Sequence, residues 1–486
     1  MMLLAASAAT AAALGFAIVT QDQAALRASP RDSAAQQASL WQGDALEVRG
    51  ERMDYLQVYD HRRERMGYVR ATQVRATGLQ EADAPQLLSV LRFVRDTPGA
   101  EAMGIAYAAA YLKAAPAADI GAEPFDALGT MAERLARRAS ARQGKAGDAV
   151  SAHLEVATHY GVTFKSYERD AAITLCYDGE AFRRVLAMAS SPGQRARAAL
   201  ALTRHDCVDP ALRPLELRQF DRWRADVLDK VNDRQFAELP ETLKNRLRLR
   251  RAGVWSLIAF DRTRQGEAST SVAAAALRAL QDLAGVAKNE LTDDDQAEYT
   301  EAAIRVGATR WAAEPVLPVN TAARLSVMTV PGEPGETCVL LLDAKRDAAK
   351  PLARRCTYGV AWTASVSVNA AGSALALAVQ PLPTWRELWV FRRQGGTWTV
   401  DVLPPSASNP ELGYVEFAGW VPAQDKLLTV REARDDRPGS GQRFRRSFEV
   451  LQLDTLAVDK QASTPHILAL FRWQDAGWKR GTVSLR

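Results

Sequence analysis

The spacing of hydrophobic residues divides the chain into three segments with different periods. Between about residues 18 and 78, apolar and polar positions alternate over short runs such as Leu46-Glu47-Val48 and Leu56-Gln57-Val58, which predicts half-buried β-strands. From about residue 82 apolar residues recur every three or four positions, and from about residue 321 the alternation returns. The pattern predicts a multidomain α+β protein: a small β-barrel over 18–78, an all-α helical array over 82–315 and an all-β domain over 321–486.

The central segment predicts a series of short helices joined by brief loops. Leu87, Leu88, Leu91 and Val94 form one apolar stripe, which Pro98-Gly99 ends. Further helical patterns lie at 146–160, 179–190, 193–205, 211–231, 241–260, 271–287 and 292–313. No fixed repeat period relates these patterns, so we expect a helical array or solenoid-like bundle rather than a named repeat.

The C-terminal segment contains two similar units about fifty residues apart, near 373–400 and 418–454. In the first, the turn Asn369–Gly372 precedes an apolar strand, and Leu388-Trp389-Val390 follows in the next strand. Units of this kind resemble β-propeller repeats, in which each blade has four strands. The segment has room for only three or four blades, so an incomplete ring or a β-meander sandwich are the alternatives.

Composition places the chain among ordinary globular proteins. Of its 486 residues, 47% are hydrophobic and 24% are charged, which excludes a disordered protein. The net charge of +5 weakly favours anionic partners such as cell-wall polymers or lipid headgroups. The first seventeen residues are apolar or small, with no charge before Asp22. They predict a secretory signal over 1–17 that is cleaved after Ala17, the alternative being an N-terminal tail.

Four cysteines fall as two local pairs, Cys176 with Cys207 and Cys338 with Cys356. Neither pair has the C-x-x-C spacing of zinc or redox sites. In an oxidising periplasm each pair would close a loop with a disulfide, which stabilises the fold by roughly 3–4 kcal/mol. Four buried free thiols are the alternative. Together with the signal, the cysteines predict a periplasmic location.

The first β segment also carries a family resemblance, over about 60 residues. The runs that carry it are Ala25-Leu26-Arg27-Ala28-Ser29-Pro30, Trp41-Gln42-Gly43-Asp44-Ala45-Leu46-Glu47-Val48, Tyr55-Leu56-Gln57-Val58 and Gly67-Tyr68-Val69. Their order resembles the bacterial SH3-like domain, with Tyr55 and Tyr68 where that family has Trp. The resemblance implies an SH3-like barrel that binds cell-wall peptides or protein partners. The aromatic side chains Trp41, Tyr55, Tyr59 and Tyr68 are candidates to line its groove, although part of this set is equally suited to the core.

No motif of catalysis, metal binding or cofactor binding stands out. The five histidines, His61, His153, His159, His205 and His466, form no H-E-x-x-H motif and no zinc cluster. Asp293-Asp294-Asp295 is interpreted as the start of a helix capped by Thr292, and 434–441 as a hairpin tip rather than a calcium loop. Arg246, Arg248, Arg250 and Arg251 are interpreted as a solvated helix face rather than a nucleic-acid contact.

These observations favour an exported binding or scaffold protein without catalysis or cofactor. Its SH3-like domain would dock a protein or peptidoglycan-type ligand, it would associate with the envelope, and nucleic acid is not expected as a partner. The alternatives are a cell-wall hydrolase or other envelope enzyme with a scattered active site, and an intracellular regulatory interaction protein. The sequence leaves the oligomeric state open.

Overall fold

The chain folds as two compact units. The computed structural model describes residues 15–141, 147–169, 172–315, 324–406, 412–434 and 444–483. The N-terminal unit comprises Met1–Leu212 and Lys230–Glu238, and the C-terminal unit comprises Arg213–Asp229 and Leu239–Arg486. The boundary between the units therefore falls within the helical domain predicted over 82–315.

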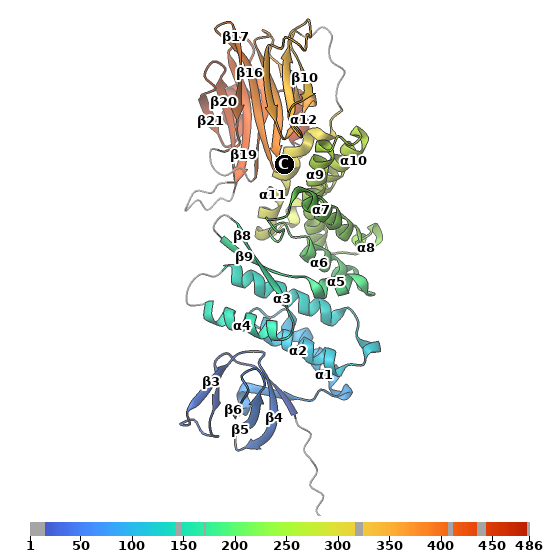
Figure 1. Cartoon of the computed structure of the whole chain (residues 1–486), viewed down its shortest axis with the longest axis vertical. Helices are drawn as coiled ribbons and strands as arrows, with labels where there is room; N and C mark the ends of the chain where they lie inside the picture. The colour runs from blue at the N-terminus through green and yellow to red at the C-terminus, as the bar shows by residue number, and fades with distance from the viewer. Residues whose placement is uncertain are drawn as a thin grey trace, which may run out of the picture. The chain divides into compact units, whose positions relative to one another are not determined.

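The N-terminal unit begins with a seven-stranded antiparallel sheet of order β3-β2-β6-β5-β4-β1-β7 (Figure 1). Its strands are β1 (Gly15–Val19), β2 (Ala24–Arg27), β3 (Gln36–Leu40), β4 (Ala45–Arg52), β5 (Tyr55–Asp60), β6 (Arg65–Arg70) and β7 (Val74–Thr77). Leu46, Leu56 and Val58 lie in its core, as their alternation with polar residues predicts. Among the described residues, β3 and β7 end the order without pairing to each other, so the hydrogen-bonded ladder does not close.

Strand β1 is buried on both of its faces. Ala17 and Val19 belong to the core of the sheet, whereas Ile18 packs with Leu87 and Tyr107 of the following helices. The strand pairs with both β4 and β7. The cleavage point expected after Ala17 thus falls inside a paired strand, and 15–17 belong to the sheet. Residues 1–14 of the expected signal lie outside the described residues.

Helices build most of the rest of the N-terminal unit. They are α1 (Ala84–Arg95), α2 (Glu101–Ala114), α3 (Glu123–Ala141), α4 (Gly147–His159), α5 (Glu180–Ala187), α6 (Pro192–Leu202) and α8 (Asp233–Ala237). The alanine-rich α2 lies so close to α3 that a Cβ added at Gly104 would be 2.1 Å from the Met131 sulfur. The array is interrupted by an unpredicted hairpin of β8 (Phe164–Arg169) and β9 (Ala172–Tyr177).

The C-terminal unit begins with its own group of helices. They are α7 (Pro214–Asp229), α9 (Glu241–Arg264), α10 (Ser269–Ala284) and α11 (Asp293–Thr309). Leu249, Leu283 and Tyr299 belong to a core shared by α9, α10 and α11. The predicted start of the last helix is confirmed, because the Thr292 hydroxyl accepts a hydrogen bond from the backbone N–H of Asp295 at 3.3 Å.

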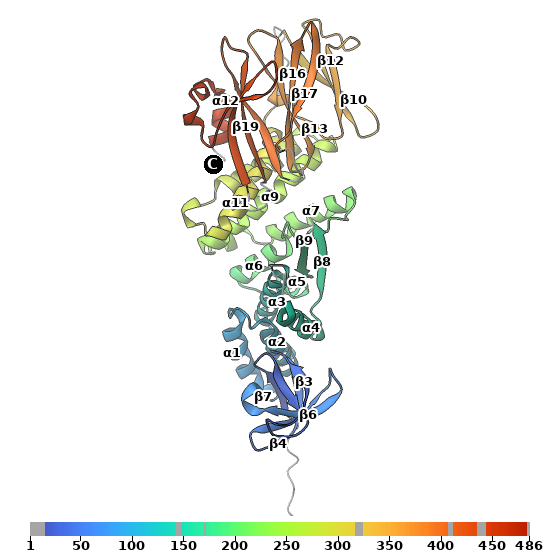
Figure 2. The same cartoon turned by 90° about the vertical axis from the view of Figure 1, so that its left-hand side faces the viewer.

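Two sheets and a final helix complete the C-terminal unit (Figures 1 and 2). The three-stranded sheet has the order β10-β11-β12, and the nine-stranded sheet has the order β13-β15-β16-β18-β19-β20-β21, with β14 on β15 and β17 on β16. The elements are β10 (Ser326–Pro331), β11 (Thr337–Leu342), β12 (Ala353–Thr357), β13 (Val360–Ala361), β14 (Ser367–Val368), β15 (Ala374–Leu382), β16 (Trp385–Gln394), β17 (Thr397–Leu403), β18 (Gly413–Trp420), β19 (Lys426–Arg434), β20 (Phe444–Gln452), β21 (Val458–Ala462) and α12 (Ala476–Val483).

The described residues contain no propeller, which corrects the propeller-like expectation. The two similar units are two antiparallel meanders, β15-β16-β17 and β18-β19-β20-β21. A short parallel contact between β16 and β18, with Trp385 opposite Gly413, joins them into one sheet. Propeller blades are separate sheets, and this pairing across the units merges what would have been two blades.

The three-stranded sheet packs on one meander of the larger sheet. Val339 and Leu341 of β11 share a core with Leu377 of β15 and with Trp389 and Phe391 of β16. On the other meander, Phe471 and Trp478 of the C-terminal segment pack against strands β18 to β20, and α12 contacts β18. Apolar residues on both faces explain why the strands contain nearly continuous hydrophobic runs.

Candidate functional site

Three of the four aromatic candidates lie on one face of the N-terminal sheet. Leu56 and Val58 of β5 point into the core, so Tyr55, Gln57 and Tyr59 point to the opposite face. On β6 their direct neighbours are Arg70, Tyr68 and Met66, respectively. Residues directly opposite in an antiparallel pair share a face. We call this set, Tyr55, Gln57, Tyr59, Met66, Tyr68 and Arg70, the outer tyrosine face.

One end of the outer tyrosine face is fixed by hydrogen bonds. The Tyr55 hydroxyl donates to Asp32 at 2.6 Å, and Arg70 pairs with both Asp32 and Asp54. The Arg70 guanidinium also lies 5.3 Å from the centre of the Tyr55 ring. Hydrogen bonds from Tyr55 and Arg70 lower the pKa of Asp32 below its usual value. Tyr55 itself is only 2% exposed, so its ring packs against its neighbours in the face and is not accessible to a ligand.

The other end of the face is more open. Tyr59 and Tyr68 are half-buried and Met66 is 47% exposed. The Arg49 guanidinium lies 4.6 Å from the Tyr59 ring centre, and the His61 ring lies edge-on to the same ring. A methionine with tyrosines and a stacked guanidinium forms an apolar surface that also offers hydrogen bonds, which is typical of protein-binding faces.

Trp41, the fourth aromatic candidate, has a different neighbour. It lies in the turn after β3, and its ring is edge-on to His153 of α4, with the ring centres 6.4 Å apart. His153 is buried and pairs with Asp22 at 2.7 Å. This contact holds Trp41 against the helices, so the expected four-residue groove is reduced to the tyrosines. Gln57, Met66 and Arg70 were missed, although strand alternation across the hairpin would have indicated them.

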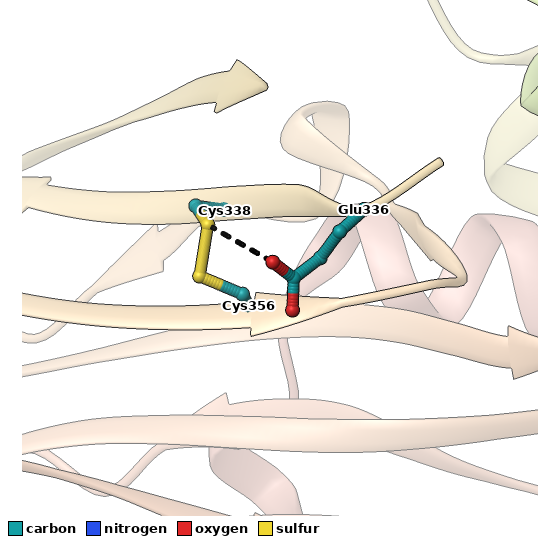
Figure 3. Close-up of side chains that lie close together, drawn as sticks. All are labelled: Glu336, Cys338 and Cys356. Atoms are coloured by element: carbon teal, nitrogen blue, oxygen red, sulfur yellow. Dashed lines mark hydrogen bonds between the residues drawn. A yellow bond between two sulfur atoms is a disulfide. The ribbon is translucent and has the colours of Figure 1, made fainter. Parts of the chain in front are cut away.

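Both expected disulfides are present. Cys176 in β9 is bonded to Cys207, which follows α6, and Cys338 of β11 is bonded to Cys356 of β12. Figure 3 shows Glu336 beside the second bridge, where its Oε2 lies 3.9 Å from the Cys338 sulfur. The carboxylate oxygen and the two sulfur atoms lie within 4.8 Å of one another. Because these sulfurs are bonded to each other, they provide no thiolate ligands for a metal in this state.

A buried ionic cluster in the C-terminal unit had no sequence signal. Arg310, which follows α11, and Arg386 of β16 both pair with the same oxygen of Glu416 on β18. Arg386 is fully buried, and its burial lowers its pKa to about 10. Arg386 also donates to the carbonyl oxygen of Gly307 in α11 at 2.6 Å. The cluster therefore ties α11 to the nine-stranded sheet.

The remaining polar candidates have local roles. Asp295 accepts a hydrogen bond from Arg246 at 2.7 Å, and Arg248 pairs with Glu241. Arg250 and Arg251 are buried, which corrects the expectation of a solvated face, because α9 is covered by neighbouring helices on several sides. His159 contacts Tyr160 and lies apart from the Trp41 contact of His153. Of the predicted hairpin tip, residues 435–441 lie outside the described residues.

Comparisons with known proteins yield no relative. No protein-family model matches the sequence, and no curated protein or solved structure matches it significantly. No helix in the described part of the chain combines the length and the apolar character needed to cross a bilayer. The outer tyrosine face and the two disulfides are therefore assessed on their geometry alone.

Proposed function

We propose that this protein is an exported binding or scaffold protein without catalysis, and that its N-terminal sheet is an SH3-like barrel. Two of the runs that resemble the bacterial SH3-like domain lie in strands β5 and β6, which carry all six residues of the outer tyrosine face. Two disulfides indicate an oxidising compartment. A mature chain in the periplasmic fraction would support export, and a chain found only in the cytoplasm would contradict it.

The ligand proposed for the outer tyrosine face is a peptide, either a protein segment or the peptide part of peptidoglycan. The observation that carries this proposal is the combination of half-buried Tyr59 and Tyr68 with the exposed Met66 and the guanidinium of Arg49. Aromatic rings offer large contact area at low entropic cost, and the phenol and guanidinium groups can bond peptide carbonyls.

Binding of the full chain to purified peptidoglycan and to soluble muropeptides tests this proposal. We expect a Tyr59→Ala/Tyr68→Ala double variant to bind at least about tenfold more weakly, as for aromatic anchors elsewhere. The matched control is Phe93→Ala, because Phe93 is 78% exposed on α1 of the same unit. Equal binding by the double variant and the wild type would refute a role for the face.

A photoreactive residue at position 66 distinguishes the two peptide sources. In cells we expect crosslinks from position 66 to peptidoglycan stems or to one defined envelope protein, and none to either from position 93. Crosslinks at equal yield from both positions would show non-specific encounter and would overturn the proposal, as would their absence from position 66.

A further inference from the structure

The bridge between β11 and β12 lies on the face of the three-stranded sheet opposite the core that this sheet shares with the nine-stranded sheet. Cys338 and Cys356 are directly opposite in the antiparallel register. Val339 and Leu341 alternate with Cys338 and point into the core shared with the nine-stranded sheet. The disulfide and Arg354, two residues from Cys356 on the same face of β12, therefore point away from that core.

The two cysteines of this bridge are unequally exposed. Cys338 is fully buried, whereas Cys356 is half-buried. An external thiolate can attack only a sulfur that it reaches, and the other sulfur then becomes the leaving group. The greater exposure of the Cys356 residue therefore favours attack on Cys356 Sγ, with Cys338 Sγ as the atom that takes the negative charge.

Two charged side chains flank the leaving sulfur. Arg354 Nη2 lies 3.2 Å from Cys338 Sγ, where the guanidinium stabilises a developing thiolate. Glu336 Oε2 lies 3.9 Å from the same sulfur, on the side shown in Figure 3. Its negative charge opposes the thiolate, but once the thiolate is protonated the carboxylate can accept a hydrogen bond from the resulting S–H group. The backbone N–H of Glu333 donates to Glu336 at 3.2 Å and holds it in place.

We propose that Cys338–Cys356 is an exchangeable disulfide whose partner is a dithiol, with Cys356 attacked and Cys338 released. A partner thiolate forms a mixed disulfide with Cys356 while the Cys338–Cys356 bond breaks and Cys338 leaves as a thiolate. The partner's second thiolate then attacks its own sulfur in the mixed disulfide and releases Cys356. The partner loses two electrons and becomes a disulfide, and the two cysteines gain those electrons and two protons.

The Cys176–Cys207 bridge serves as an internal control in the same chain. It also joins a buried to a half-buried cysteine. Among the described residues, however, neither of its sulfur atoms receives a hydrogen bond from a charged side chain such as Arg354 gives Cys338. A difference in exchange rate between the bridges therefore reports on the surroundings of the sulfur atoms.

The experiment treats the full chain with dithiothreitol at fixed pH, quenches by alkylation and follows each bridge by peptide mass spectrometry. We expect Cys338–Cys356 to be reduced first. Arg354→Gln should slow its reduction about three- to tenfold, Arg354→Lys should retain most of the rate, and Glu336→Gln should accelerate it. Cys176–Cys207, which lies in the N-terminal unit, should keep its rate in every variant, and an unchanged urea midpoint by tryptophan fluorescence shows that the C-terminal unit of each variant is folded.

The position of a trapped adduct tests the direction of attack. With glutathione as the probe, we expect the mixed disulfide on Cys356 in peptide maps. An adduct on Cys338, equal reduction rates for the two bridges, or an unchanged rate in Arg354→Gln would each overturn the proposal. These outcomes are independent of whether the outer tyrosine face binds a peptide.

Discussion

The sharpest prediction concerns Glu416, the carboxylate shared by two buried arginines. Glu416 is 3% exposed, Arg386 is 0% exposed and Arg310 is 5% exposed. Among the described residues, Arg310 Nη2 and Arg386 Nε have no hydrogen-bond partner. The shared carboxylate therefore offsets much of the free-energy cost of burying the two positive charges. A Glu416→Gln variant keeps the shape of the side chain but removes its charge. It leaves two guanidiniums in the interior without the negative charge that both of them contact.

The expected cost is large because the charges are buried. Removing one partner of a buried ion pair costs about 3–5 kcal/mol, whereas a solvent-exposed pair is worth about 0–1 kcal/mol. With all three side chains at most 5% exposed, the first range applies. We therefore expect Glu416→Gln to lower the free energy of unfolding of the C-terminal unit by about 3–5 kcal/mol. Such a loss is a large fraction of the stability of an ordinary domain.

Urea unfolding followed by tryptophan fluorescence measures this loss. Of eleven tryptophans, Trp41 lies in the N-terminal unit and the other ten lie in the C-terminal unit, so the signal reports on the latter. The surface control is Glu216→Gln, which breaks the exposed Arg213–Glu216 pair and should leave the midpoint unchanged. A triple replacement of Arg310 and Arg386 by Met and Glu416 by Leu should recover most of the stability. A loss below about 1 kcal/mol in Glu416→Gln would show that Glu416 does not compensate the buried charges of the two arginines.

Two further predictions concern pH and a tight turn. Burial raises the pKa of Asp282 from 3.8 to about 6, so the folded state takes up a proton at a pH where the unfolded carboxyl is ionised. The C-terminal unit should gain about 2–3 kcal/mol as the pH falls from about 7 to about 4. The urea midpoints of Asp282→Asn should lack this gain, and equal slopes in both proteins would contradict it. Gly43 has a φ of +88°, and a Cβ added there would lie 2.5 Å from the Ala102 carbonyl oxygen. We expect Gly43→Ala to destabilise the N-terminal unit by about 1–3 kcal/mol, measured by thermal unfolding. Gly99→Ala should cost less, because a Cβ at Gly99 meets open space.

Local sequence patterns predicted some features of the candidate sites and missed others. The alternation in β5 was enough to separate Leu56 and Val58 from Tyr55 and Tyr59. It did not reveal that Trp41 contacts α4, because His153 lies more than a hundred residues away along the chain. The pairing of the cysteines followed from their local spacing. The charged neighbours of Cys338 did not, because only the β11–β12 register places Arg354 beside it.

Patterns in the sequence predicted the order of β, α and β segments, the start of α11 after Thr292 and the pairing of the four cysteines. These features depend on periodicity, capping and short loops, which act over a few residues or close a short stretch of chain. The merging of the two similar β units into one sheet, and the contact of Arg310 and Arg386 with Glu416 in the interior, depend on the three-dimensional fold. The physical reason is that a strand's pattern specifies which face is buried but not which strand pairs with it, and that a buried charge is tolerated only where distant residues supply its partner.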